Sequence, residues 1–179
     1  MKYRALALTL VTLGYAEAAV VSSPVFNPTT GHHYYLLSQS TWTEARAESI
    51  LLGGDLAVIN NAAENDWIYN TFSNFGGLSR RLWIGLTDQA QEGVFRWVDG
   101  STPSYTNWFT SQPDNGSGGL PEHFVHLDGP TDIYPSQWND LPDVVLGTYG
   151  VAEVIPEPSI YAYSLVILTT SILRRKRRA

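Results

Sequence analysis

The stretch between residues 112 and 140 contains three short motifs, Gln112-Pro113-Asp114, Glu122-His123-Phe124-Val125 and Gln137-Trp138-Asn139-Asp140. Each motif carries side chains with oxygen donors. The donors are Gln112, Asp114, Glu122, Asn139 and Asp140. Ca²⁺ is a hard cation that takes about 6–8 oxygen ligands from carboxylates, amide carbonyls and water. The stretch therefore indicates a cation site. Because its ligands come from separate segments, the rest of the chain must form the scaffold that brings them together.

The composition is that of one ordinary domain with short appendages. The chain has 179 residues, of which 44% are hydrophobic, and its 6 Trp, 10 Tyr and 6 Phe suit a compact core. The formal charge is -6, yet residues 19–158 hold only four basic residues against sixteen acidic ones. An acidic body argues against nucleic acid as a partner and is compatible with cation binding. Without cysteine, the chain has neither disulfides nor thiolate chemistry.

The N-terminal segment predicts export. Lys2 and Arg4 precede an apolar run over 5–15, and Ala16-Glu17-Ala18 follows it. This order is typical of a secretory signal peptide, with residues 1–18 removed after Ala18. The alternative is a buried helix of the domain.

The C-terminal segment predicts sorting at a membrane. Pro156-Glu157-Pro158 precedes an apolar run over 160–173, and the basic residues 174–178 end the chain. The apolar run is shorter than the roughly 20 residues of a usual transmembrane helix, and the basic end is expected to stay cytoplasmic. The segment 156–179 resembles the PEP-CTERM sorting signal of Gram-negative bacteria, which implies recognition by a membrane protease of the exosortase type. The alternative is a plain membrane anchor.

This resemblance implies a location for the body of the protein. It is expected at the surface or in the extracellular matrix of a Gram-negative bacterium, after transient anchoring in the inner membrane through residues 160–173.

The body predicts two helices followed by strands and long loops. A helix after the capping box Thr41-x-x-Glu44 is expected to end at Gly53-Gly54, and a second, capped by Asn61-x-x-Glu64, at Gly76-Gly77. Apolar or alternating segments predict strands at 33–39, 56–59, 83–86, 94–98, 124–127, 137–138 and 147–154. Residues 99–121 lack periodicity and form a long loop of the kind that usually has a function.

Several motifs together resemble the C-type lectin-like domain over nearly the whole body. They are Trp42-Thr43-Glu44-Ala45, Gly53-Gly54-Asp55-Leu56-Ala57-Val58-Ile59, Trp83-Ile84-Gly85-Leu86, Phe95-Arg96-Trp97 and Trp138-Asn139-Asp140. The resemblance implies an α+β fold in which two helices pack on antiparallel sheets and a long loop carries the ligand site. We place this domain at 32–155, after a linker over 19–31.

The resemblance also implies the chemistry of the site. In sugar-binding members, a Gln-Pro-Asp or Glu-Pro-Asn triplet, a later Glu and an Asn-Asp pair bind one Ca²⁺ and two vicinal sugar hydroxyls. Carried onto this chain, these ligands are Gln112, Asp114, Glu122, Asn139 and Asp140. Pro113 is then expected to follow a cis peptide bond.

The triplet Gln112-Pro113-Asp114 resembles the galactose type, whose members usually add an aromatic ring soon afterwards. Here residues 115–119 contain none. The stacking contribution of about 1 kcal/mol is expected to be missing unless Trp108 or Tyr134 supplies a ring.

A second, auxiliary Ca²⁺ site is implied at Asp88 and Glu92, with Glu122 shared. Asn115 and His123 stand where further acids often lie in the family, so this ion is expected to bind weakly. The alternative for Asp88 and Glu92 is a capped turn before Gly93.

The main departure from the family concerns its two disulfides. The implied pairs are Ser49 with Ala152 and Phe124 with Asp143, and none of these residues is cysteine. Bridges that close loops of ~100 and ~20 residues are worth roughly 3–5 kcal/mol each in the chain-entropy model. The aromatic core and calcium are expected to supply that stability instead.

Two other function classes compete with a calcium-dependent lectin. An enzyme is suggested only by His123 and His126 beside Glu122 and Asp128, and no nucleophile elbow, P-loop or dinucleotide fingerprint is present. We therefore expect no catalysis. The second alternative is a structural or adhesive surface protein that uses the same fold for protein contacts.

Overall fold

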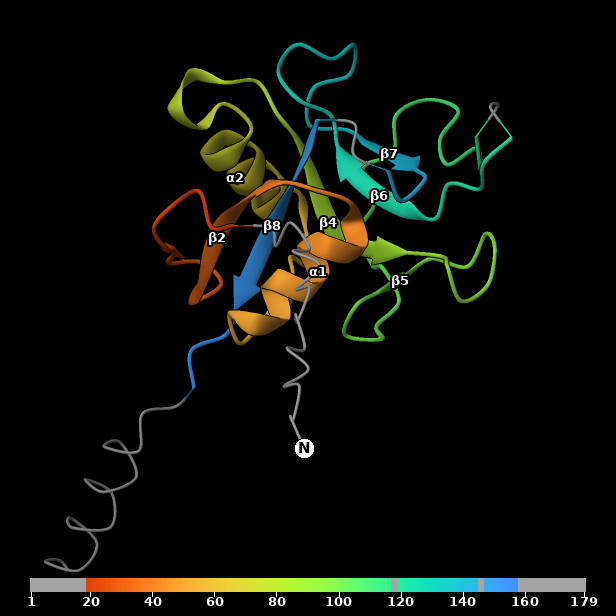
Figure 1. The fold of residues 1–179 in the computed structure, drawn as a ribbon. Helices are drawn as coiled ribbons and strands as arrows, with labels where there is room; N and C mark the ends of the chain where they lie inside the picture. Colours follow the sequence, from red (N-terminus) through yellow and green to blue (C-terminus); the bar gives the residue numbers. More distant parts are fainter. Residues whose placement is uncertain (1–18, 117–118, 145–146, 158–179) are drawn as a thin grey trace, which may run out of the picture.

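The computed structural model describes residues 19–116, 119–144 and 147–157, in which two helices pack against one sheet (Figure 1). The expected signal peptide, the apolar run 160–173 and Pro158 lie outside the described residues. Pro156 and Glu157 follow the last strand and are exposed. Among the described residues, no helix is long and apolar enough to cross a membrane.

Eight strands form a single sheet in the order β1-β2-β8-β4-β6-β7, with β3 paired to β8 and β5 paired to β4. Their bounds are β1 (Val25–Asn27), β2 (His32–Gln39), β3 (Asp55–Leu56), β4 (Arg81–Thr87), β5 (Arg96–Trp97), β6 (Phe124–Leu127), β7 (Trp138–Leu141) and β8 (Thr148–Val154). β8 lies between β2 and β4, antiparallel to the first and parallel to the second. The sheet is mixed rather than purely antiparallel, which corrects one detail of the expected fold.

Two of the expected strands are shorter in the structure. Of the segment 56–59, only Leu56 lies in a strand, β3, which begins at Asp55. Further along, the Val58 amide donates to the Glu153 carboxylate (2.9 Å) rather than to a neighbouring strand. The segment 94–98 contributes only β5. The segment expected at 137–138 extends instead to Leu141 in β7, and its pairing with β6 places Asp140 opposite Val125.

Part of the expected linker is built into the sheet. Within residues 19–31, β1 pairs with β2, and an isolated bridge joins Val20 to Leu37. A three-residue edge strand in a segment rich in Ser, Pro and Thr is too short to show an alternation of apolar and polar residues, so sequence alone did not reveal it.

The two helices begin where their caps predict. α1 (Trp42–Leu51) has the full capping box: Thr41 accepts from the Glu44 amide, and the Glu44 side chain accepts from the Thr41 amide. α2 (Ala62–Phe72) begins with the Asn61 side chain, which accepts from the Glu64 amide. The Gly76 region forms a short 3₁₀ turn, η1 (Phe75–Gly77), after α2.

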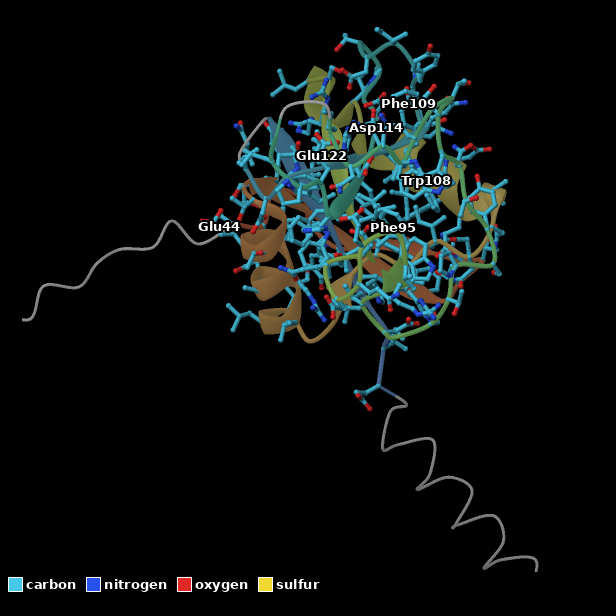
Figure 2. All side chains as sticks on the ribbon, turned by 90° about the vertical axis from the view of Figure 1, so that its right-hand side faces the viewer. Glu44, Phe95, Trp108, Phe109, Asp114 and Glu122 are labelled. Atoms are coloured by element: carbon cyan, nitrogen blue, oxygen red, sulfur yellow. The ribbon has the colours of Figure 1, made fainter. Side chains whose placement is uncertain are left out.

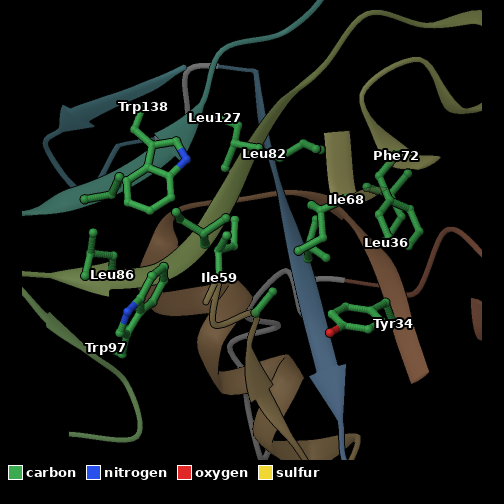
Figure 3. Close-up of a cluster of buried hydrophobic side chains, with 14 residues drawn as sticks. Tyr34, Leu36, Ile59, Ile68, Phe72, Leu82, Leu86, Trp97, Leu127 and Trp138 are labelled. Carbon is green, nitrogen blue, oxygen red and sulfur yellow. The ribbon is translucent and has the colours of Figure 1, made fainter. Parts of the chain in front are cut away.

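The core lies between the helices and the sheet and extends under the long loops (Figure 3). It is made of aliphatic side chains from β2, α2, β4 and β6, with Trp97 and Trp138 at one end and Tyr34 and Phe72 at the other. Its fully buried members include Leu36, Ile59, Ile68, Phe72, Leu82, Ile84, Leu86, Val125 and Leu127. Burying such side chains contributes about 1.5–3 kcal/mol each before entropy costs.

Trp138 anchors the end of this core that contains Trp97. Its ring makes edge contacts with Trp97, Tyr105 and Trp108 at centroid distances of 5.8, 5.6 and 5.8 Å. The indole N–H donates to the Asn65 side chain of α2 over 2.7 Å. β7, α2 and the long loop are thereby fixed to one another.

Packing and hydrogen bonds occupy the positions where the family's disulfides are expected. Ser49 and Ala152 are both fully buried, and the Ser49 hydroxyl donates to a carbonyl of its own helix. At the second pair, the Phe124 ring packs on the Trp42 ring, with 4.7 Å between their centroids. The Asp143 carboxylate accepts hydrogen bonds from the main-chain N–H and the hydroxyl of Thr43. These contacts connect α1 to β6 and to the segment after β7.

Replacing Asn65 by Ala tests the anchor. The change leaves the buried Trp138 indole N–H without its acceptor, and an unsatisfied buried donor costs about 1–3 kcal/mol. We expect the free energy of unfolding in urea to fall by that amount. Asn70→Ala, at an exposed position of the same helix, is the matched control and should change it little. Equal losses in the two variants would contradict the anchoring role.

Candidate metal centre

Three carboxylates from separate segments converge at one end of the molecule. They come from Asp114 in the long loop, Glu122 just before β6, and Asp140 in β7, and their oxygens lie within 4.8 Å of one another. Figure 2 shows Asp114 and Glu122 at the end of the molecule where Phe109 also lies. None of the ion pairs among the described residues involves these three groups.

Backbone hydrogen bonds hold the loop around Asp140. The Asp140 carboxylate is 1% exposed and accepts from the amides of Asp114 (3.3 Å) and Asn115 (3.1 Å). The Asn115 side chain in turn accepts from the Glu122 amide (2.9 Å). The Gln112–Pro113 peptide bond is cis. The loop therefore closes on β7 through its own main chain.

Gly116 is required by the closeness of this packing. Its φ is +72°, and a Cβ placed there would lie 2.9 Å from the Glu122 carboxyl carbon. A larger residue would strain the backbone and displace that carboxylate.

Two amide oxygens next to these carboxylates in the sequence lack partners. Oε1 of Gln112 and Oδ1 of Asn139 are buried acceptors that make no hydrogen bond. A buried acceptor without a hydrogen-bond partner is rare, because leaving it unsatisfied costs stability. A hard cation held by neighbouring carboxylates and amide oxygens would satisfy both atoms.

The electrostatics of the cluster favour the same explanation. Burial, with help from Asp140 and then Asp114, raises the pKa of Glu122 to about 7. Burial also raises the pKa of Asp140, although the Asn115 and Asp114 amides oppose it. Carboxylates held this close repel one another, and a divalent cation removes that repulsion.

A second cluster contains Asp88 and Glu92, where an auxiliary ion was expected. Asp88 follows β4 and is 1% exposed, and Glu92 lies in the turn after it. Their carboxylate oxygens and a ring nitrogen of His123 lie within 4.8 Å of one another. From the sequence, His123 was expected either to replace an acid of the auxiliary site or to belong to a candidate enzyme site with His126, and not to join Asp88 and Glu92 as a ligand. Its place beside Asp88 depends on the register of β4 with β6, which the motif did not reveal.

The aromatic candidates differ in their accessibility. Trp108 makes ring contacts with both Trp138 and Phe95, so its partly buried ring packs against the core. Figure 2 labels Trp108 and Phe95 on the same face of the molecule. Tyr134 is 41% exposed and stacks on Phe109 with centroids 4.8 Å apart. The Phe109 carbonyl also accepts a hydrogen bond from the main-chain N–H of Gln112 (3.0 Å).

The other histidine of the considered enzyme site is buried elsewhere in the sheet. His126 is fully buried, contacts Asp128 through Nε2 (3.0 Å) and packs edge-on against Trp83. It is not part of either cluster of metal-ligand side chains found among the described residues.

The fold and the loop site define a domain of the lectin type, and comparison with known proteins identifies the family. The model of the family described as Lectin C-type domain matches residues 38–142. The chain belongs to the C-type lectin domain family, a family of carbohydrate-binding, non-enzymatic domains.

The relatives share this domain rather than their whole length. The chain is 33% identical to human "C-type mannose receptor 2" over 129 residues, which are 72% of this chain and 8% of the receptor. It is 42% identical to the "Alpha-N-acetylgalactosamine-specific lectin" of Patiria pectinifera over 94 residues, or 49% of this chain and 51% of that lectin.

A solved structure agrees with the fold. The carbohydrate-recognition domain of the mouse scavenger receptor C-type lectin is 33% identical with a TM-score of 0.58, covering 70% of this chain and 92% of that domain.

The raised pKa of Glu122 predicts a pH dependence of stability without divalent ions. Its pKa is 4.5 ordinarily and about 7 in the folded protein, so between these values the folded state binds more protons than the unfolded state. We therefore expect the free energy of unfolding in EGTA to fall as the pH rises from about 4.5 to about 7. Urea denaturation across this range measures it.

Glu122→Gln supplies the control for this prediction. The amide does not titrate, so the slope assigned to Glu122 should disappear. A variant that keeps the full slope would show that another group causes it.

Proposed function

We propose that this chain is an exported, calcium-dependent carbohydrate-binding protein with a galactose-type site. The observation that carries the proposal is the convergence of three carboxylates together with two buried, unpartnered amide oxygens, those of Gln112, two residues before Asp114, and of Asn139, next to Asp140. Oxygen donors of both kinds, drawn from five side chains, suit Ca²⁺. The ligands are Gln112, Asp114, Glu122, Asn139 and Asp140.

The same residues provide the polar groups that a sugar needs. Ca²⁺ held by these residues would offer its remaining positions to vicinal sugar hydroxyls. Carboxylate and amide groups then accept or donate hydrogen bonds to those hydroxyls, and this fixes their orientation. Because the contact area is small, affinity for one sugar is modest and multivalent display increases it.

Two observations support galactose or N-acetylgalactosamine as the sugar class. The triplet Gln112-Pro113-Asp114 is of the galactose type, and one relative is named as specific for α-N-acetylgalactosamine. Residues 115–119 contain no aromatic ring. Tyr134, which is exposed and stacks on Phe109, offers an aromatic face in its place.

A glycan array with millimolar Ca²⁺ or with EGTA tests this function. We expect binding to galactose-type glycans that EGTA abolishes, and a melting temperature that EGTA lowers. Asp140→Asn removes one buried charge and should weaken calcium and sugar binding by more than the roughly 10–100-fold that loss of an outer-shell partner costs.

Asp66→Asn, at an exposed position of α2, is the matched control and should bind as the parent does. Binding that ignores EGTA would point instead to the alternative of a protein-contact surface. An unchanged melting curve in EGTA would refute the metal site.

We further propose that Pro156-Glu157-Pro158 and the residues after it are a sorting signal of the PEP-CTERM type. It would place the lectin at a bacterial surface after removal of its C-terminal segment by an exosortase-type protease. The support is the order of the motif, the apolar run 160–173 and the basic end.

Processing is tested by mass spectrometry of the protein released from the producing cells. We expect a mass that lacks the basic residues 174–178 and the apolar run before them. An intact C-terminus on the released protein would refute cleavage.

A further inference from the structure

The ends of β4 and β6 bring an aspartate and a histidine face to face. The two strands pair antiparallel with Thr87 opposite Phe124, so Asp88 and His123 stand at the next position of the ladder. The Asp88 amide donates to the His123 carbonyl over 3.3 Å. Their side chains also meet, with 3.0 Å between Asp88 Oδ1 and His123 Nδ1. The sheet itself therefore fixes this pair.

The turn after Asp88 adds a third donor. Asp88 Oδ2 accepts from the Gly93 amide (2.7 Å), and the Asp88 carbonyl accepts from the Gln91 amide (2.9 Å). These bonds bring Glu92 back toward the strand, where its Oε2 lies 3.5 Å from His123 Nδ1. Asp88 Oδ1 and Glu92 Oε2 thus both face one imidazole nitrogen.

The spacing suits a small divalent ion. Metal–ligand bonds of about 2.0–2.2 Å in a tetrahedron place neighbouring donor atoms about 3.4 Å apart. The two distances from His123 Nδ1, 3.0 and 3.5 Å, lie on either side of that value. Three protein donors also leave a fourth position for water, as in open zinc sites.

The donor types separate this cluster from the calcium site. Imidazole nitrogen suits zinc and its neighbours among the transition metals, whereas Ca²⁺ takes oxygen ligands almost exclusively. Only two of these three donors are carboxylates. The buried Asp88, 1% exposed, has His123 as its charged partner among the described residues. Glu92 is half-exposed, with 52% of its side chain accessible, so an ion has a path to the cluster.

We propose that Asp88, Glu92 and His123 form a second metal site that takes a transition metal of the Zn²⁺ class in place of calcium. The expectation of an auxiliary Ca²⁺ at Asp88 and Glu92 is replaced by this assignment. Asp88 is oriented by the Gly93 amide, which serves as its outer-shell partner. The site stands beside the proposed calcium site without sharing a donor, because Glu122 serves one and His123 the other.

The test is titration of the untagged full chain with Co²⁺, followed by its visible absorption, and then displacement with Zn²⁺, all in millimolar Ca²⁺. We expect one equivalent of Co²⁺ with an imidazole-type spectrum, and release by one equivalent of Zn²⁺. Glu92→Gln changes a half-exposed side chain and should weaken Co²⁺ binding while leaving the fold intact.

His123→Asp distinguishes the two classes of ion. It replaces the nitrogen donor by oxygen, so Zn²⁺ affinity should fall by more than the roughly 10–100-fold cost of an outer-shell change, while Ca²⁺ affinity at the cluster rises. His32→Gln is the matched control, because His32 also contacts a carboxylate, that of Glu153, but in no three-donor group among the described residues. It should leave Co²⁺ binding unchanged.

Two results would overturn the proposal. One is Co²⁺ binding that persists in full in both Glu92→Gln and His123→Asp. The other is displacement of Co²⁺ or Zn²⁺ by Ca²⁺ at equal concentration. Asp140→Asn separates this test from that of the proposed function, because it should remove calcium-dependent sugar binding and retain the Co²⁺ signal.

Discussion

The structure depends first on how Trp138 is held. Its ring touches three other aromatic rings, its indole N–H binds Asn65 of α2, and its main chain binds the long loop: its amide donates to the Asn107 carbonyl (2.8 Å), and its carbonyl accepts from the Phe109 amide (3.2 Å). The next two residues along β7 are Asn139 and Asp140. The buried indole of Trp138 thereby connects the packed core to the polar loop. Because Asn139 and Asp140 follow it directly in β7, its position also fixes theirs.

The loop site combines close packing with unfavourable charge. Three carboxylates lie together, burial raises the pKa of Glu122 to about 7, and the buried amide oxygens of Gln112 and Asn139 have no hydrogen-bond partner. The repelling carboxylates stay together because other contacts of the fold hold them in place. Here the contacts that hold it are the Asp140–loop hydrogen bonds, the Phe124–Trp42 ring contact and the Asp143–Thr43 bonds. A bound cation would convert the repulsion into the strongest attraction of the loop.

Adjacent residues of one segment face two chemically different clusters. Glu122 adds an oxygen to a site rich in carboxylates and amides, and His123 adds a nitrogen to a site with two carboxylates. Consecutive side chains at the start of a strand point in opposite directions, which is what allows two clusters so close in sequence to remain separate. The ion proposed for each cluster follows from the donors it offers.

Sequence alone determined the fold class and the caps of both helices and predicted the main ligand set, because these depend on local spacing and on motifs whose residue types are chemically specific. Thr41-x-x-Glu44 and Asn61-x-x-Glu64 mark helix starts whatever lies around them. Contacts between distant segments were decided only by the tertiary structure. β1 has no period of its own and forms because β2 offers it an edge, and β8 inserts between β2 and β4, antiparallel to the first and parallel to the second. His123 meets Asp88 only through the register of β4 with β6, and the Asn65–Trp138 hydrogen bond joins residues 73 positions apart. No local pattern encodes such pairings, since they arise from packing a whole core around one set of rings.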